Sequence, residues 1–335
     1  MLDGNLRAID SAIRRLRPRA EIVHLLEPYG YGRAAKLRYL LRMIRGTYHV
    51  RTAGLVIVDN AWLPVHVAPH RAGTTVVQVW HAAGALKRFG MDTTRPPDEP
   101  ERSFLHRHYD WVVTAGEASR GPWAAALRTP VDRVLPLGSA RTDDLLDPAR
   151  LASARSRAFD LYPALAGRRV VLYAPTFRGR GAAKADGGVI DPARLRALLP
   201  PTDVLVLKSH PNLDPALVPT DGYDVVASPA DDMNDLLALA DVLVTDYSSS
   251  VFEFALLRRP IVLVVPDLET YERDPGLYLD LRTDLVGALV RDTDAAAAAI
   301  TAGVVDDAAY DAFIVRNLGG CDGHAAERIV ERFVR

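Results

Sequence analysis

The sequence predicts an α/β protein with two domains, and three observations support this. Short apolar runs rich in β-branched residues alternate with helical patterns along most of the chain. Runs such as 170–174, 204–208 and 261–265 are apolar on both faces, which is typical of parallel strands covered by helices on each side. The length of 335 residues exceeds what one hydrophobic core usually supports. We therefore expect a parallel sheet in each of two domains.

The composition is that of an ordinary globular protein inside a cell. Hydrophobic residues make up 49% of the chain and the formal net charge is −1, which excludes bulk disorder. The single cysteine, Cys321, forms no internal disulfide, and no cysteine and histidine cluster has zinc spacing. The first residues lack the apolar core of a secretory signal, and no apolar run is long enough to span a bilayer. We therefore expect a cytoplasmic protein with neither a metal site nor a resident cofactor.

Positive charge is concentrated at the start of the chain. Residues 1–53 carry 11 Arg and Lys against 4 Asp and Glu, a net charge of +7. The pattern predicts a basic amphipathic helix over residues 33–47, with four aliphatic side chains on one face. Two interpretations fit this helix: a domain helix with solvated charges, or a surface that docks on anionic lipid, where each basic residue adds about 1 kcal/mol. Nucleic acid is not expected, because the sequence pI of about 6.8 is not basic.

The first domain is predicted to cover residues 1–145 and the second residues 146–335, with the option that the last helix packs back on the first domain. A polar helical stretch at 139–167 joins them. Both domains are expected to be Rossmann-like and to face a cleft. The predicted strands lie at 21–26, 55–59, 74–80, 111–114, 134–137, 170–174, 204–208, 224–227, 242–245 and 261–265.

Ligands of open α/β sheets bind beyond the carboxyl ends of the strands, so polar residues that directly follow strands are the site candidates. His81 follows the strand at 74–80, with Lys87 one turn further along. Lys208 and His210 lie at the end of the strand at 204–208 in a similar way. An imidazole at such a position is suited to accept a proton from an attacking hydroxyl. The alternative for each histidine is a core or capping role.

Two further segments carry groups that suit an anion. Thr176 and Arg178 come just after the strand at 170–174. The guanidinium of an arginine matches the geometry of phosphate oxygens. The alternative is a surface loop with solvated arginines. Ser248 to Ser250 lie at the start of a short helix after the strand at 242–245, where backbone N–H groups point outwards. The alternative there is a capping box between Ser250 and Glu253.

Motifs of other enzyme classes are absent from the sequence. It contains no GxxxxGK[ST] loop, GxGxxG fingerprint, GxSxG elbow or HExxH pair, so P-loop, dinucleotide-dependent, serine hydrolase and zincin chemistries have no support.

Six separated blocks together resemble the CDP-glycerol glycerophosphotransferase family of teichoic acid and capsule polymer synthesis. The blocks are VVQVWHAAGALKRFG, LGSARTDDLL, VLYAPTFRG, LKSHPN, the stretch from VTDYSSSVFEF to GLYLD, and CDGHAAERIVE, spread over residues 74–330. The resemblance implies a GT-B fold with the nucleotide held mainly by the second domain. It also implies transfer of a polyol phosphate from its CDP derivative to a hydroxyl of a lipid-linked acceptor, with release of CMP.

The resemblance also implies site residues. His81 and His210 match the family's WHG and HP histidines, and Glu253 stands where the family has an acidic residue. The remaining matches are the PTFR block (Thr176, Arg178), the DYSS block (Asp246, Tyr247, Ser248, Ser249) and a PRxD block (Arg141, Asp143). Ala82 and Ala140 depart from the family's usual Gly and Pro. Our hypothesis makes His81 the general base, and His210, Arg178 and Ser248 to Ser250 the pyrophosphate ligands.

Two alternatives remain at this point. One is a transferase or epimerase of the same architecture that uses a UDP-sugar. The other is a catalytically silent binding protein, for which Ala82 is the sequence support. The sequence leaves open the polyol, the oligomeric state and whether one unit or many are added.

Overall fold

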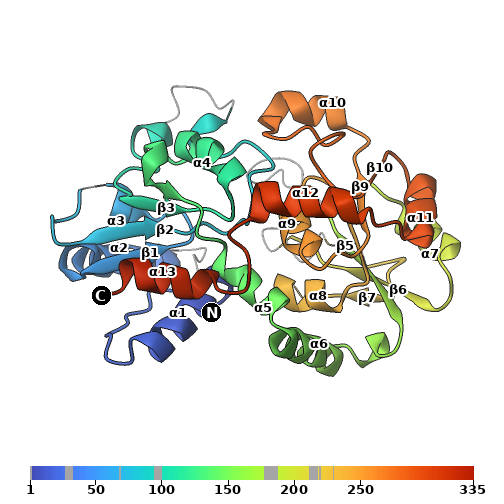
Figure 1. Cartoon of the computed structure of the whole chain (residues 1–335), viewed down its shortest axis with the longest axis horizontal. Helices are drawn as coiled ribbons and strands as arrows, with labels where there is room; N and C mark the ends of the chain where they lie inside the picture. The colour runs from blue at the N-terminus through green and yellow to red at the C-terminus, as the bar shows by residue number, and fades with distance from the viewer. Residues whose placement is uncertain are drawn as a thin grey trace. The chain divides into compact units, whose positions relative to one another are not determined.

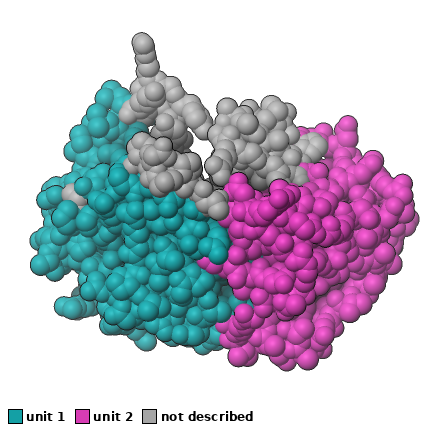
Figure 2. All heavy atoms as spheres, turned by 90° about the horizontal axis from the view of Figure 1, so that it is seen from above, with its two compact units in different colours: residues 1–143, 317–335 teal, residues 144–316 magenta. Residues whose placement is uncertain are grey.

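A computed structural model describes residues 2–26, 33–67, 69–93, 100–176, 188–210, 218, 220–228 and 230–335 (Figure 1). The chain forms two compact units, coloured separately in Figure 2. Unit 1 comprises residues 1–143 and 317–335, and unit 2 comprises residues 144–316. The boundary that we predicted at 145/146 lies within helix α5 (Asp143–Leu146).

Unit 1 contains a parallel sheet of four strands in the order β1-β2-β3-β4. The strands are β1 (Leu55–Val58), β2 (Thr75–Gln78), β3 (Trp111–Val113) and β4 (Val134–Leu135). The register pairs Leu55 with Thr75 and Val77 with Trp111. Valines at the centre of the sheet are almost fully buried, which explains the apolar runs in the sequence.

The helices of unit 1 include one pair that is distant in sequence. They are α1 (Gly4–Leu16), α2 (Arg33–Thr52), α3 (Leu63–His66), α4 (Arg120–Ala126) and α13 (Ala325–Phe333). Helices α1 and α13 lie side by side (Figure 1), and Ile9 packs in one core cluster with Ile329 and Val77. Where the chain returns to unit 1, Gly138 (φ +99°) and Gly320 approach so closely that a Cβ on either would overlap backbone atoms.

The predicted strand at 21–26 does not form, and these residues have no regular secondary structure. Val23 is about half exposed, and the imidazole of His24 contacts Asp10 of α1 instead of a sheet neighbour. Residues of high β-propensity stay irregular when no adjacent strand completes their hydrogen bonds.

Unit 2 contains a six-stranded parallel sheet in the order β10-β9-β8-β5-β6-β7. The strands are β5 (Arg169–Ala174), β6 (Asp203–Leu207), β7 (Val225–Val226), β8 (Val242–Thr245), β9 (Ile261–Val264) and β10 (Ala288–Val290). This is the doubly wound Rossmann order, and the direction of winding reverses between β5 and β8. The predicted α/β class with two parallel sheets is confirmed.

Several helices of unit 2 begin at an aspartate cap. They are α6 (Pro148–Leu161), α7 (Pro192–Leu198), α8 (Met233–Leu239), α9 (Ser250–Ala255), α10 (Leu268–Tyr271), α11 (Thr293–Ala302) and α12 (Asp307–Leu318). Asp147, for example, accepts hydrogen bonds from the backbone N–H groups of Ala149 and Arg150 at the start of α6. Within the described part of the chain, no helix combines the length and apolarity needed to cross a bilayer.

Candidate functional site

His81 lies in the loop that follows β2 at the carboxyl edge of the unit 1 sheet. Part of the residue is exposed to solvent, whereas the Trp80 ring covers one face of its imidazole, with ring centroids 4.4 Å apart. Its Nδ1 lies 3.2 Å from the backbone oxygen of Asp59, which follows the neighbouring strand β1. A carbonyl oxygen only accepts, so this contact makes Nδ1 the protonated nitrogen and leaves the lone pair on Nε2.

Two cations lie near His81 and affect its protonation. Desolvation lowers the pKa of His81 below its ordinary value, and the positive charges of Arg141 and Lys87 lower it further. The hydrogen bond with the Asp59 carbonyl acts in the opposite direction, but more weakly than desolvation. The imidazole is therefore neutral at pH 7 and able to accept a proton.

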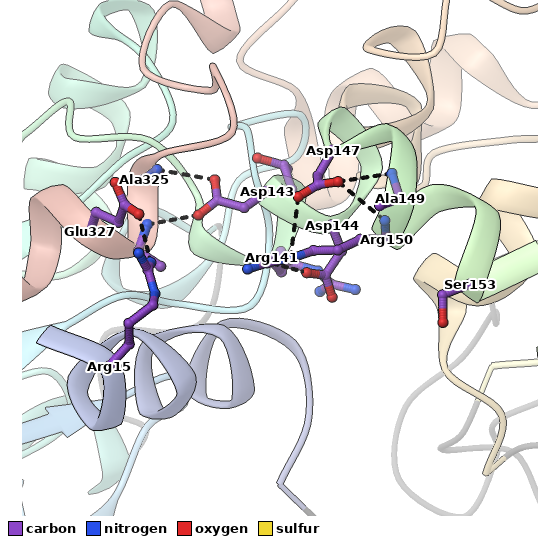
Figure 3. Close-up of polar contacts among 12 residues, drawn as sticks. Arg15, Arg141, Asp143, Asp144, Asp147, Ala149, Arg150, Ser153, Ala325 and Glu327 are labelled. Atoms are coloured by element: carbon purple, nitrogen blue, oxygen red, sulfur yellow. Dashed lines mark hydrogen bonds and ion pairs between the residues drawn. The ribbon is translucent and has the colours of Figure 1, made fainter. Parts of the chain in front are cut away.

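Arg141 and Asp143, which both follow β4, have different roles. The Nη1 of Arg141 donates to the backbone oxygen of His81 at 2.7 Å, so this side chain reaches the candidate base. The buried carboxylate of Asp143 instead accepts from the backbone N–H groups of Ala325 and Ala326, at 3.0 and 2.8 Å (Figure 3). Asp143 thus caps the start of α13. This capping role is sufficient to account for a buried aspartate at this position, with no need for contact with a ligand.

In unit 2, three sequence-predicted segments follow the adjacent strands β8, β5 and β6. Because these strands are parallel neighbours, their carboxyl ends bring the segments to one edge of the sheet. The carboxylate of Asp246, which is fully buried, accepts from both the backbone N–H and the hydroxyl of Thr176, each at 2.9 Å. This pair of bonds joins the loops after β5 and β8 at the point where the winding reverses.

The remaining residues of the DYSS segment differ in burial. Tyr247 is fully buried, stacks on Tyr271 with centroids 3.5 Å apart, and donates its hydroxyl to Asp267. Ser248 and Ser249 are half-buried. The position of Tyr247 indicates that it supports the loop rather than contacting a ligand.

The capping box that the sequence suggested at α9 is not formed. Ser250 is the first residue of the helix rather than its N-cap, and its N–H and hydroxyl both donate to the Ser248 hydroxyl oxygen. Glu253 lies in the first turn and is almost fully buried. A carboxylate in such a position is costly to bury unless other groups solvate it.

The segment after β6 places Lys208 and His210 differently. The ammonium of Lys208 is buried and donates to the backbone oxygens of Ser228 and Asp231, at 2.7 and 3.0 Å. Desolvation lowers the pKa of Lys208. His210 is half-buried at the edge of the sheet. Arg178, the predicted phosphate ligand, lies outside the described residues.

The structure also identifies residues near His81 that the sequence analysis did not single out. Asp59 supplies the carbonyl that fixes the tautomer, while Asn5 and Gln78 contact the backbone next to His81. Asn5 lies more than 70 residues from the loop it contacts, so no local pattern reveals it. Asp59 is the last residue of the strand predicted at 55–59, and a polar residue at that end of a strand is the one sequence signal that would have found any of the three.

Comparison with known proteins shows which family this chain belongs to. The model of the family described as CDP-Glycerol:Poly(glycerophosphate) glycerophosphotransferase matches residues 1–335. The teichoic acid ribitol-phosphate primase of Bacillus spizizenii is 29% identical over 339 residues, covering 98% of this chain and 87% of that protein. The teichoic acid poly(ribitol-phosphate) polymerase of the same organism is 32% identical over 301 residues, covering 88% of this chain. The chain spans about half of that polymerase, 49% of its length.

A solved structure shares the fold. A variant of the wall teichoic acid polymerase TagF, soaked with CDPG, superposes with a TM-score of 0.76 at 20% identity. The match covers 98% of this chain and 85% of that one. This likeness confirms the predicted GT-B-like fold.

Proposed function

Because this chain belongs to the CDP-glycerol:poly(glycerophosphate) glycerophosphotransferase family, we propose that it transfers a polyol phosphate from a CDP-polyol to a hydroxyl of a lipid-linked acceptor. The acceptor oxygen forms a bond to the phosphorus that carries the polyol. The bond between that phosphorus and the oxygen of the cytidine-bearing phosphate breaks, and CMP leaves. The donor nucleotide enters as a substrate and the proposal needs no resident cofactor.

The observation that carries this proposal is the state of His81. Its Nδ1–H is directed to the Asp59 carbonyl, which leaves Nε2 as a proton acceptor, and desolvation together with the nearby cations lowers the pKa of the ring. During attack, the acceptor hydroxyl passes its proton to Nε2. Arg141, which contacts the His81 backbone, adds positive charge where negative charge develops on the transferring group.

The donor is assigned to unit 2. The loops after β5, β6 and β8 meet at the carboxyl edge of its sheet, next to the point where the winding reverses. We assign His210, Arg178 and the serines 248–250 to the pyrophosphate, and Glu253 to a ribose hydroxyl. Asp246 acts indirectly, because its carboxylate is occupied by Thr176. The relatives include both a ribitol-phosphate and a glycerol-phosphate primase, so the donor class is a CDP-polyol of three to five carbons.

A lipid-linked acceptor requires contact with a membrane, and α2 offers a surface for it. Leu37, Leu40, Leu41 and Ile44, spaced as one helix face, are each more than half exposed. Gly46 lies against Trp62 and Pro64 with no room for a Cβ, so the helix packs on unit 1 through its other face. We propose that the exposed face enters anionic lipid at the cytoplasmic side of the membrane, helped by the positive charge of residues 1–53.

The proposed activity is tested by CMP release. Purified chain is incubated with CDP-glycerol or CDP-ribitol and a lipid-linked acceptor, and both CMP and the extended acceptor are measured. His81→Gln is expected to lower turnover by about 100- to 10,000-fold. His24→Gln serves as the control, because His24 is a second histidine of unit 1 that pairs with Asp10 instead. Equal turnover in the two variants would remove His81 from the role of base.

A nucleotide screen separates this function from the UDP-sugar alternative. A nucleotide that binds the folded chain raises its melting temperature, by an amount that grows with its concentration relative to the dissociation constant. We expect CDP and CMP to raise the melting temperature and UDP and UMP to leave it unchanged. Protection by uridine nucleotides alone contradicts the proposal, and cytidine protection without CMP release indicates a silent binding protein.

A further inference from the structure

The residue before His81 has a strained backbone. Trp80 has a φ of +52°, in the left-handed region that glycine occupies easily and a bulky L-residue does not. Strain of this kind persists only where surrounding groups hold the residue in place, and it is concentrated at functional sites. Trp80 follows β2 directly, so its conformation sets the direction in which the chain presents His81.

Two buried amide side chains hold the backbone of Trp80. Its N–H donates to Oε1 of Gln78 at 2.7 Å, and its carbonyl oxygen accepts from Nδ2 of Asn5 at 2.6 Å. Asn5 is 2% exposed and Gln78 is fully buried. The Trp80 ring also stacks on Phe89, with centroids 5.0 Å apart. Other residues therefore hold both the backbone and the side chain of Trp80 in place.

Asn5 joins this loop to the one that follows β4. Its Oδ1 accepts from the backbone N–H of Arg141 at 2.8 Å and from the hydroxyl of Ser139 at 3.2 Å. Arg141 in turn donates to the carbonyl oxygen of His81. The carbonyls of Trp80 and His81 are consecutive, and each has a donor from a segment distant in sequence.

The sequence around Asn5 gives no folding reason for an amide. The buried face of α1 is otherwise apolar, with Ala8, Ile9, Ala12 and Ile13 packed in the core. Asparagine is a weaker helix former than alanine or leucine. A fourth polar contact, from Nδ2 to the Val79 carbonyl oxygen, is longer at 3.5 Å. The residue is explained by these contacts to the two loops rather than by its helix.

We propose that Asn5 is a positioning residue for His81, acting through the Trp80 peptide and the Arg141 loop. This inference rests on the proposed function, in which His81 is the base. When Trp80 is held in its left-handed conformation, His81 lies within reach of the Asp59 carbonyl and its Nε2 stays open. Without the Asn5 amide, Trp80 relaxes towards a negative φ and the imidazole loses its fixed tautomer.

Three variants test the proposal. Asn5→Ala removes all four contacts. Asn5→Asp keeps an acceptor for Arg141 and Ser139 but replaces the donor to the Val79 and Trp80 carbonyls by a carboxylate oxygen. Ile13→Ala is the matched control, because it creates a cavity on the same buried face of α1, about two helical turns from Asn5, and removes no hydrogen bond to either loop. We expect both Asn5 variants to lower kcat about 10- to 100-fold, the range that small misplacements of reacting groups produce. KM for the CDP-polyol stays unchanged, because the donor is assigned to unit 2.

A second experiment asks whether a glycine at position 80 makes the Asn5 amide unnecessary. In a Trp80→Gly background the left-handed conformation no longer needs support, so Asn5→Ala is expected to lower kcat much less than it does beside Trp80. An equal effect of Asn5→Ala in the two backgrounds contradicts action through the Trp80 peptide. Asn5→Asp serves in the same comparison if Asn5→Ala does not fold.

A readout independent of activity completes the test. Nitrogen NMR of the His81 ring reports which nitrogen carries the proton. We expect the Nδ1–H tautomer in the parent and in Ile13→Ala, and a mixture of tautomers in both Asn5 variants. The proposal is overturned if both Asn5 variants keep the Nδ1–H tautomer and have the same kcat as Ile13→Ala. If the parent transfers no polyol phosphate, the proposed function fails, while the NMR result still decides the role of Asn5.

Discussion

The carboxylate of Asp246 receives two hydrogen bonds from a single residue, Thr176, through its backbone N–H and its hydroxyl. The two residues follow β8 and β5, the neighbouring strands at which the unit 2 sheet changes its direction of winding. This pair fixes the spacing of the two loops to which we assign the donor.

Asp246→Ala is expected to destabilise the protein by about 3 kcal/mol, because it leaves a buried N–H and a buried hydroxyl of Thr176 without their acceptor. Urea unfolding measures this change. Asp235→Ala is the control: Asp235 pairs with Arg157 at the surface, and such pairs contribute about 1 kcal/mol or less. Equal costs for the two variants would show that the Asp246 contact is not held in the folded protein.

Asp143→Ala is expected to cost about 2 kcal/mol of unfolding free energy, since the first turn of α13 loses an acceptor that serves two backbone N–H groups. Asp143→Asn retains one acceptor oxygen and is expected to cost less. Cytidine nucleotides should protect both variants as they protect the parent. A stable Asp143→Ala protein without transferase activity would instead place Asp143 in the reaction.

The acid limb of the transferase pH profile is expected to have its midpoint below 6.5, the ordinary pKa of histidine, because desolvation and two cations lower the pKa of His81. Protonation removes the acceptor on Nε2, so kcat/KM falls as the pH falls through that midpoint. Lys87→Met removes one cation and is expected to move the limb to higher pH.

Arg88→Met is the control for that shift, because Arg88 is adjacent in sequence and its guanidinium pairs with Asp92. The limb of this variant should coincide with that of the parent. A limb that moves equally in the two variants, or in neither, argues against His81 as the titrating group.

Replacing Leu40 and Ile44 of α2 by Gln is expected to weaken binding to anionic vesicles in a sedimentation assay by about 100-fold or more, since each buried aliphatic side chain contributes about 1.5–3 kcal/mol. Val304→Gln with Val315→Gln is the control, because these residues of unit 2 are also exposed. Binding by the parent should decrease in roughly 0.5 M salt. Binding that is insensitive to salt, or equal on neutral vesicles, counts against electrostatic docking.

A strand could be predicted where its own residues indicate it, and the prediction failed where the strand depends on its neighbours in the sheet. Runs such as Val170–Ala174 are buried on both faces, so their composition alone indicates a central parallel strand. Residues 21–26 have a similar composition but no neighbouring strand. Strand β10 was not predicted, because three residues at the edge of a sheet, with Leu289 partly exposed, give too short a run.

The same distinction holds for the site. His81 was predicted because it directly follows a strand, and position after a strand can be read from the sequence. Which nitrogen of His81 carries the proton depends on Asp59, and the path of its loop depends on Asn5, through contacts that span 22 and 75 residues. The sequence also offered Asp143 as a site residue, and only its contact with α13 reveals a capping role.

The return of residues 317–335 to unit 1 has a consequence for biosynthesis. Unit 2 is encoded as an insertion within unit 1, and the partners of Ile9 and Asp143 on α13 are translated only after all of unit 2. On the ribosome, unit 2 has its complete sequence first, while the half that carries His81 waits for its closing helix. A nascent chain therefore acquires its nucleotide-assigned half before the half that holds the base.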